Sequence, residues 1–374
     1  MTRKQRMLNA YRGLPVDRTP VAPEFWYYYP AKIMGVDMME FEREVPFWKG
    51  LQIAFNTFDC EGWGAVFVVP QSTDTHEEME FKSIGEGRYR ETKRLRRREM
   101  PLTETRIFSK DSPSWIEEHL VHDEKELDEY IGIMLNGSNE YDLSAAREAH
   151  ARVGDDYLLE FYLGLPFFDF FEQAMGFENA VEYFLSENDT KLKGLRDRYT
   201  EYQKELVGKI CRDTGFEALF IGCSSSCNSL LGPRMWREWD KPFLAEMARE
   251  THAHGRLLHI HFHGRCRETV RDLVDIGADC ICPFERPPGG DIDGIEGLAR
   301  VRQQLAEKVT MNGNVHTVET LIRGSPRKVC EEVGEIREAF RGSTRVIIGT
   351  GDQVGAETPE ENIHAMIEEA RKPA

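Results

Sequence analysis

The chain has 374 residues, of which 40% are hydrophobic and 30% are charged, and its formal net charge is −17. This length buries a sizeable core in one large domain or two ordinary ones. The negative charge disfavours a nucleic acid or an anionic membrane as partner, because such proteins carry basic patches, and it weakly disfavours a polyanionic substrate. No apolar run approaches the roughly 20 residues of a membrane span.

Cysteine usage and the first residues indicate the compartment. Eight cysteines in 374 residues are too sparse for a disulfide scaffold. Residues 1–6 are basic, but the apolar segment of a signal peptide does not follow them. We therefore expect a reduced, cytoplasmic protein.

The first half of the chain contains four apolar segments that are typical of strands. They lie at residues 21–26, 63–69, 157–163 and 218–223, and helices are expected at 4–11, 41–58, 124–134, 167–174, 177–185, 189–214 and 233–254. Residues 78–110 differ, because they are polar and basic around Lys93–Arg98 and carry turn residues at Gly85–Gly87. We interpret them as a β-hairpin excursion whose basic run is a solvated edge.

The second half is regular. Strands are expected at 257–263, 280–285, 309–313 and 345–351, and a helical segment follows each of them. Together the two halves give eight strand-then-helix units, which predict a parallel sheet with right-handed crossovers. Eight units in a chain of this length predict one α/β domain over residues 1–374: a closed (β/α)₈ TIM barrel with an N-terminal extension and the hairpin excursion.

Polar residues gather near the ends of the predicted strands. In such a barrel the active site lies at the carboxyl ends of the strands, so these residues are expected at one mouth. They are Glu24, Glu160, Cys223, His261, His263, Glu285, Asn314 and Asp352.

Three histidines alternate along the strand 257–263, at positions 259, 261 and 263. Alternate side chains of a strand point to the same face, so all three face one way. One interpretation is a buried polar network in which each imidazole meets a carbonyl group. The other, which we favour, is that His261 and His263 hold Zn²⁺ or another divalent metal ion, with His259 lying deeper as a structural residue.

The third metal ligand is open between carboxylates and thiols. Glu285, Cys223 and Cys266 are candidates, but Asp352 is preferred because Gly349–Gly351 lets the backbone approach closely there. Cys280 and Cys282 are interpreted as small core residues of a buried strand. Two aromatic clusters mostly belong to the core or an interface, and Trp26 and Phe167 are the members expected to wall a substrate pocket.

Several segments resemble the uroporphyrinogen decarboxylase-like superfamily, which includes corrinoid-linked methyltransferases. The matching segments are Asp17–Val21 (DRTPV), Gly232-Pro233 opening a long helix that ends in Ala253–Gly255, His261–Gly264 (HFHG), Met311–Asn314 (MNGN) and Thr358–Ile363 (TPEENI). The family fold is a (β/α)₈ barrel, in agreement with the strand count.

The resemblance separates two branches. True uroporphyrinogen decarboxylases carry an arginine-rich early motif that holds the carboxylates of the substrate, whereas the segment 24–29 has no arginine. The methyltransferase branch binds zinc through an H-x-C-G strand end and a distant cysteine. Here His261 matches the family histidine, while His263 and Asp352 stand where the two cysteines belong. Such a harder ligand set suits activation of an oxygen atom.

The resemblance therefore implies a metal-dependent methyltransferase. It would move a methyl group between a small methylated donor, expected to be an O-methyl compound, and a corrinoid protein, because the chain has no D-x-H-x-x-G segment to bind the corrinoid itself. Glu160 or Glu285 would orient the substrate or handle a proton, and Glu24, Cys223 and Asn314 would border the pocket. Two alternatives stay open: a decarboxylase or lyase acting on a small carboxylic acid, and a barrel that only binds a ligand. Oligomeric states including a homodimer are open too.

Overall fold

The computed structural model describes the chain except residues 99, 137–138, 187–188 and 374. Its centre is a sheet of eight parallel strands, in the order β1-β14-β13-β12-β11-β10-β9-β2. The strands are β1 (Val21–Ala22), β2 (Trp63–Val66), β9 (Leu158–Tyr162), β10 (Ala218–Cys223), β11 (Leu257–Phe262), β12 (Cys280–Pro283), β13 (Thr310–Val315) and β14 (Val346–Thr350). Each of the eight predicted strands overlaps one of these, and β13 extends two residues beyond the predicted strand 309–313, so the predicted (β/α)₈ barrel is confirmed.

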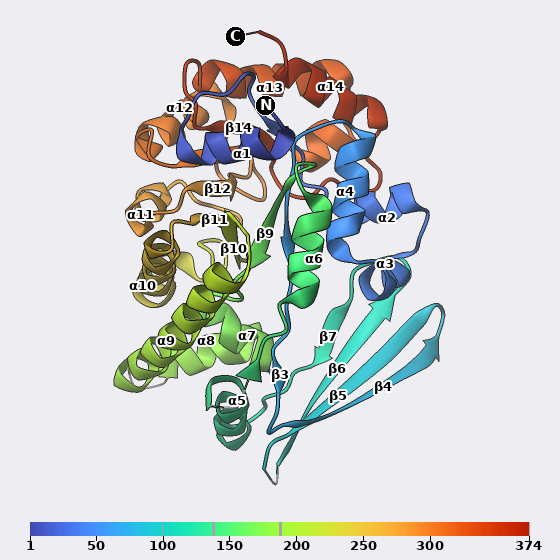
Figure 1. Ribbon diagram of the computed structural model, residues 1–374, viewed down its shortest axis with the longest axis vertical. Helices are drawn as coiled ribbons and strands as arrows, with labels where there is room; N and C mark the ends of the chain where they lie inside the picture. Colours follow the sequence, from blue (N-terminus) through green and yellow to red (C-terminus); the bar gives the residue numbers. More distant parts are fainter. Residues whose placement is uncertain (99, 137–138, 187–188, 374) are drawn as a thin grey trace.

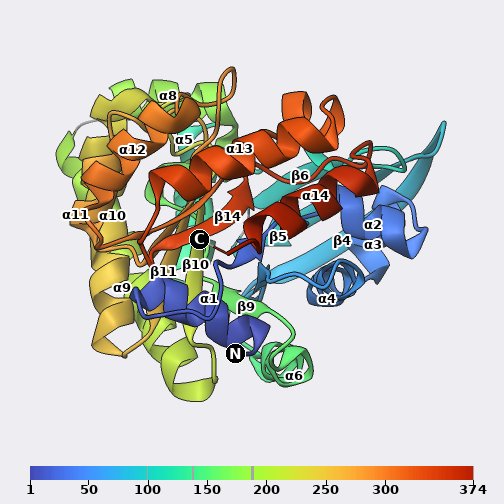
Figure 2. The same cartoon turned by 90° about the horizontal axis from the view of Figure 1, so that it is seen from above.

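Helices lie on the outside of the strands (Figures 1 and 2). From α9 to α14, neighbouring helices pack against each other in chain order, as right-handed crossovers require. They are α1 (Arg3–Arg12), α2 (Tyr28–Met34), α3 (Met38–Glu44), α4 (Phe47–Thr57), α5 (Glu124–Asn136), α6 (Ser144–Val153), α7 (Phe167–Met175), α8 (Phe177–Ser186), α9 (Asp189–Asp213), α10 (Gly232–Ala253), α11 (Val270–Ile276), α12 (Gly294–Leu305), the π-helical turn η1 (Thr317–Ile322), α13 (Pro326–Ala339) and α14 (Glu360–Ala370).

The helix predicted over residues 41–58 is in fact two helices, α3 and α4. Pro46 stands between them, and a proline has no N–H group to continue a helical hydrogen-bond ladder. The N-terminal extension is helical as expected: α1 lies across the amino ends of the strands, where Thr310 at the start of β13 donates a hydrogen bond of 2.6 Å to the carbonyl of Ala10.

The excursion near residues 78–110 is present and is larger than a hairpin. It is a four-stranded antiparallel sheet in the order β4-β5-β6-β7. Its strands are β4 (His76–Gly85), β5 (Arg88–Arg96), β6 (Pro101–Ser109) and β7 (Trp115–Glu118), and a short pair formed by β3 (Gln71–Ser72) and β8 (Asn139–Glu140) flanks it. In Figure 1 the sheet projects away from the barrel beside α3.

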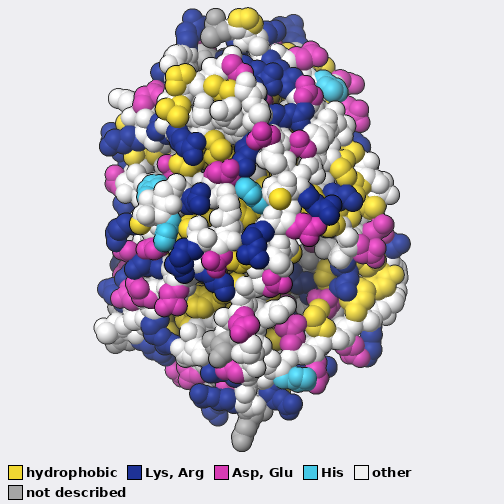
Figure 3. All heavy atoms as spheres, viewed as in Figure 1, with side chains coloured by type: hydrophobic (Ala, Val, Ile, Leu, Met, Phe, Trp, Pro, Cys, Tyr) yellow, Lys and Arg dark blue, Asp and Glu magenta, His cyan; other side chains and the backbone are white. Residues whose placement is uncertain are grey.

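Of the three hydrophobic cores in the described residues, a small one joins α2 and α3, and the other two follow from the alternation of side chains along the strands. The larger core fills the space between the sheet and the helices. A smaller core fills the barrel itself and includes Tyr11 from α1, Trp63, Phe220, Cys280 and Cys282. The face of the surface in Figure 3 shows positive and negative side chains interspersed. No helix in the described part of the chain is long and apolar enough to cross a membrane.

Candidate active site and metal centre

The three alternating histidines of β11 point into the barrel, as the strand pattern predicts. His259 and His261 are buried, and His263, just beyond the strand, is partly exposed at the mouth. Parallel pairing with β12 aligns His259 with Cys280 and His261 with Cys282. The imidazoles and the thiols therefore form stacked layers, from the floor of the barrel to its mouth.

His259 belongs to a closed hydrogen-bonded network at the deepest level. Its Nδ1 atom lies 2.9 Å from the Oε2 atom of Glu160 and 3.1 Å from the hydroxyl of Tyr11, and its Nε2 atom lies 3.1 Å from the Sγ atom of Cys282. Burial raises the pKa of the Glu160 carboxyl, although His259 partly offsets this effect. Glu160 is fully buried beneath His261, so its position suits holding the imidazoles in place rather than contacting a substrate.

His261 joins two other potential metal ligands in the next layer. Its Nδ1 atom lies 3.1 Å from the Sγ atom of Cys282 and 3.8 Å from the Oε2 atom of Glu24. One ligand atom from each of these three buried residues lies within 4.8 Å of the other two. Nitrogen, thiolate sulfur and carboxylate oxygen are the ligand types of protein-bound zinc, so this group can hold such an ion.

The charges around Glu24, His261 and Cys282 also favour binding of a metal ion. Burial, together with the neighbouring imidazoles, lowers the pKa of His261 well below its ordinary value, so the ring is neutral and has a free lone pair. Burial raises the pKa of Glu24 and of the Cys282 thiol, and nearby carboxylates add to both shifts. In the described residues no lysine or arginine forms an ion pair with Glu24, so a divalent cation would supply the missing positive charge.

His263 lies on the opposite side of the His261 ring. The two Nε2 atoms are 2.7 Å apart, and the Nδ1 atom of His263 is 3.1 Å from the Oε1 atom of Glu285. The same oxygen accepts a hydrogen bond of 2.6 Å from the backbone N–H of Gly264. Burial would lower the pKa of His263, but the bond to Glu285 and the charge of Asp352 outweigh burial and raise it. Glu285 therefore orients His263 at the mouth.

Asp352 lies beyond β14, where its charge interacts with that of His263. Burial raises its pKa, and the charge of His263 opposes that shift. The structure thus brings His261 and His263 together as predicted and places Asp352 close enough to His263 for their charges to interact. The compact three-ligand group of the described residues is nevertheless Glu24, His261 and Cys282.

Aromatic rings wall one side of the histidines. Trp26 packs against Phe47 and Trp63, with ring centroids 4.8 and 5.4 Å away, and Trp63 reaches within 6.0 Å of His261. Phe67 continues this wall outward and is 43% exposed. Trp26 thus lies among the aromatic rings beside the histidines, and its role in a substrate pocket stays a prediction.

Three other predicted pocket residues are fully buried. Phe167 packs among Phe171 and Phe184 of the helical layer, so its position is that of a core residue. Cys223 is buried at the end of β10, where burial raises its pKa. The Asn314 side chain donates a hydrogen bond of 3.1 Å to the carbonyl of Ile292 and so shapes a loop.

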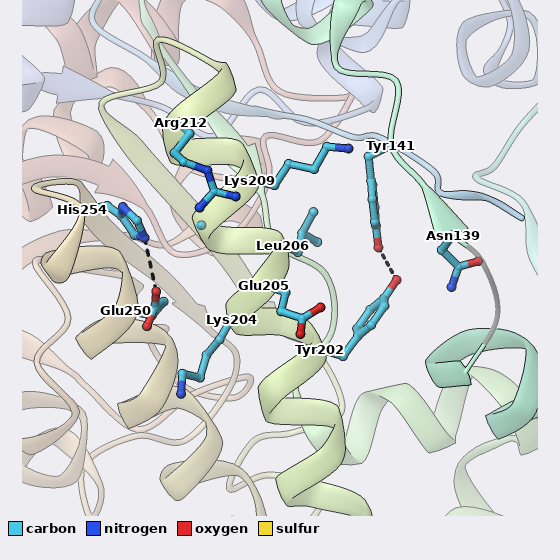
Figure 4. A pocket seen from close by; sticks show the side chains of 11 residues that line it. Asn139, Tyr141, Tyr202, Lys204, Glu205, Leu206, Lys209, Arg212, Glu250 and His254 are labelled. Atoms are coloured by element: carbon cyan, nitrogen blue, oxygen red, sulfur yellow. Dashed lines mark hydrogen bonds and ion pairs between the residues drawn. The ribbon is translucent and has the colours of Figure 1, made fainter.

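A cleft of about 390 Å³ opens beside the histidines. Glu285, which contacts His263, lines this cleft together with Asp352, and so do His316, Arg286 and Arg323. Larger hollows lie elsewhere: one of about 680 Å³ between α9 and α10 (Figure 4), and one of about 750 Å³ at the amino ends of the strands. Neither of these larger hollows is lined by the three histidines of β11 or by a residue that contacts them. We therefore assign the site to the smaller cleft, because its lining residues Glu285 and Asp352 interact with His263.

Cys282 is the residue that the sequence interpretation missed. The pattern Cys280-Ile281-Cys282 correctly indicates that both thiols are buried on one face of a strand. A signal was available, because Cys280 and Cys282 have the same spacing as His259 and His261 on the preceding strand. Adjacent parallel strands with matching spacing can place such residues side by side.

These observations define the chain as a (β/α)₈ barrel with a buried Glu-His-Cys group near the carboxyl ends of its strands. The model of the uroporphyrinogen decarboxylase (URO-D) family matches residues 108–373, and the chain belongs to that family. A solved structure of a methyltransferase from Methanosarcina mazei superposes with a TM-score of 0.67 at 17% sequence identity, covering 99% of this chain and 98% of that one. An uncharacterized protein matches 42% of this chain and 39% of its own, at 14% identity and a TM-score of 0.27. No curated protein sequence matches the chain.

Proposed function

We propose that this chain is a metal-dependent methyltransferase that moves a methyl group between a small O-methyl donor and a corrinoid protein. The observation that carries the proposal is the Glu24-His261-Cys282 group at the barrel mouth. The full-length fold likeness to the Methanosarcina mazei methyltransferase and membership of the URO-D family support it.

Two ligand sets on the two sides of the His261 ring are the candidates for the metal. On the Nδ1 side, Glu24 and Cys282 complete a mixed oxygen, nitrogen and sulfur set. On the Nε2 side, His263 with Asp352 would give the set expected from the sequence. We favour the first set, because its three ligand atoms already lie close together and lack another cation in the described structure.

The roles of the surrounding residues follow from their positions. A bound divalent ion would act as a Lewis acid on the heteroatom that carries or accepts the methyl group. Glu285, which lines the cleft, holds His263 in place, and the Nε2 atom of His263 would accept the Nε2–H of His261 and so keep the His261 Nδ1 lone pair turned toward the metal. Trp26 and Phe67 exclude water on the other side and offer an apolar surface to the methyl donor.

The alternative activity, decarboxylation of a small acid, agrees with the name of the family. The charge of the mouth argues against it, because the carboxylates of Asp352 and Glu285 add to the burial that raises the pKa of Glu24, and Glu285 likewise adds to the burial that raises the pKa of Asp352. An acid substrate would add a further negative charge beside them. A neutral donor avoids this repulsion, and we therefore rank methyl transfer first.

Elemental analysis of purified variants tests the proposal and separates the two ligand sets. We expect about one zinc or similar ion per wild-type chain, loss of that ion in His261→Ala and Cys282→Ala, and retention in His263→Ala. Cys280→Ala is the matched control, because it removes an equally buried thiol that is outside the ligand group. Loss of metal in His263→Ala but not in Cys282→Ala would move the site to the other side of the ring.

Activity is measured as methyl transfer from a panel of methyl ethers to free cob(I)alamin, whose absorbance changes on methylation. His261→Ala should lose transfer together with metal. A metal-free wild-type protein that releases CO₂ from small carboxylic acids, and transfers no methyl group, would refute the proposal in favour of the decarboxylase.

A further inference from the structure

Strand β4 is the free edge of the four-stranded sheet. In the described structure it pairs with β5 alone, and all ten of its residues are exposed. Figure 1 shows it along the outer border of the projecting sheet. One row of its backbone N–H and C=O groups therefore faces outward without a partner strand. Such a row is a template for a further strand.

The side chains of β4 protect this edge only in part: Glu77, Glu78, Glu80 and Lys82 are charged, which leaves the edge open to a strand of complementary charge. The strand is long, it contains no proline, and its single irregularity lies at one end, between Ser83 and Gly85. Met79 and Phe81 are 57% and 38% exposed. The Phe81 ring stacks on Tyr89 and lies 3.9 Å from the guanidinium of Arg43, which holds it in place next to the edge. The edge thus offers a preordered aromatic side chain.

We propose that β4 pairs antiparallel with β4 of a second copy of this chain, with the two-fold axis passing through Phe81. Oligomers of identical chains most often use such a self-complementary interface. The pairing would join the two sheets into one continuous sheet of eight strands. Main-chain hydrogen bonds would supply the association, as in other cases of β-strand addition.

The charges of β4 select this register. When the axis passes through Phe81, Glu80 of each chain faces Lys82 of the other, and the two Phe81 rings face each other. An axis through Glu80 would oppose two glutamates at the centre, and an axis through Met79 would oppose Glu78 to Glu80 twice. Like charges directly opposite each other are destabilising, so only the register centred on Phe81 avoids them among these three.

Glu80 and Lys82 can exchange partners at little cost. In the single chain they form an ion pair with each other, and their side chains are 44% and 67% exposed. Pairing of two chains would replace two internal ion pairs with two ion pairs between chains. Because both residues lie on the open face of an edge strand, their substitution leaves the fold and the barrel mouth intact.

Charge reversal tests the proposal by light scattering after size-exclusion chromatography. Wild type should have the mass of two chains in the micromolar range. Glu80→Lys and Lys82→Glu should each dissociate, with dimerisation weakened about tenfold or more. The double variant E80K/K82E, and an equimolar mixture of the two single variants, should both restore the dimer, because opposite charges face each other again.

Glu77→Lys is the matched control, because Glu77 points to the other face of β4 and faces no charged residue in this register. It should leave the dimer unchanged. A wild-type protein that is a monomer throughout this range, or a dimer that neither single charge reversal weakens, would overturn the proposal. Circular dichroism of each variant confirms that a change in mass reflects dissociation and not unfolding.

Discussion

Two buried carboxyl groups, Asp169 on α7 and Asp240 on α10, predict an unusual dependence of stability on pH. Asp240 is fully buried and accepts a hydrogen bond of 2.9 Å from the backbone N–H of Phe168, in the first turn of α7. Burial raises the pKa of Asp240 to about 7. Burial, together with the charge of Asp240, also raises the pKa of Asp169 well above its ordinary value.

The sign of the effect follows from the raised pKa. In the unfolded chain Asp240 titrates near 3.8, so the folded protein binds an additional proton between pH 3.8 and about 7. Its stability is therefore highest at low pH in this window and falls as the pH rises through about 7. At 1.36 kcal/mol for each pKa unit, the loss is about 4 kcal/mol. Asp240→Asn keeps the oxygen that accepts from Phe168 but cannot ionise.

We expect Asp240→Asn to be more stable than wild type at about pH 8, by up to about 4 kcal/mol, and equally stable near pH 4. Urea unfolding followed by the fluorescence of Trp236 and Trp239, which lie on the same helix, measures the difference. Asp240→Ala is the control, because it also removes the acceptor and should be about 1 kcal/mol less stable than Asp240→Asn at every pH. A destabilisation of Asp240→Asn that is equal at both pH values would refute the reasoning.

Three further substitutions have expected effects on stability, each measured by thermal unfolding. Gly313→Ala should cost more than about 3 kcal/mol, because its Cβ atom would meet the backbone carbonyl of Pro283, whereas Gly334→Ala, in an open position of α13, should gain about 0.5–1 kcal/mol. Hydrogen bonds from a neighbouring histidine and lysine outweigh burial and lower the pKa of Glu217 to about 2. Glu217→Gln should therefore be less stable than wild type at pH 7, by up to about 1 kcal/mol, and this difference should vanish as the pH falls toward 2. Arg286→Ala should reduce the free energy of unfolding by about 3–5 kcal/mol, because it leaves the carboxylates around the buried guanidinium without a counter-charge. The control Arg300→Ala, at an exposed arginine, should reduce it by less than about 0.5 kcal/mol.

The barrel could be predicted from sequence because its strands carry a local signal. Each is a short apolar segment followed by a helical pattern, and parallel pairing with right-handed crossovers then allows few topologies. The alternation of His259, His261 and His263 likewise reports one face of one strand, which is local information. Polar residues that follow apolar segments, such as His263, Glu285 and Asp352, accordingly lie just beyond the ends of β11, β12 and β14.

The contacts between strands could not be predicted in the same way. The alternation of side chains along a strand tells which face of the sheet each one occupies. It does not tell which residues of the neighbouring strand lie beside it, because that depends on the register between the strands. Glu160 lies in the middle of β9, not at its end, and consequently meets His259 beneath the mouth. Cys282 lies opposite His261 only through the pairing of β11 with β12. Phe167 belongs to a helix whose aromatic side chains all favour burial, and its pattern does not distinguish the core from a pocket.

The charge of the mouth links the metal to the choice of substrate. Glu24, Glu285 and Asp352 are partly or fully buried near one another, and in the described structure none of them forms an ion pair with lysine or arginine. A divalent cation would neutralise part of this charge, and its preferred place would be beside Glu24, the most deeply buried carboxylate, because electrostatic interactions strengthen in a low dielectric. The remaining carboxylates then repel anions at the entrance. If the chain is the metal-dependent methyltransferase proposed above, the same negative charge that favours a metal would also favour neutral donors over acids, so metal content and substrate charge should change together when Glu24 is replaced by glutamine.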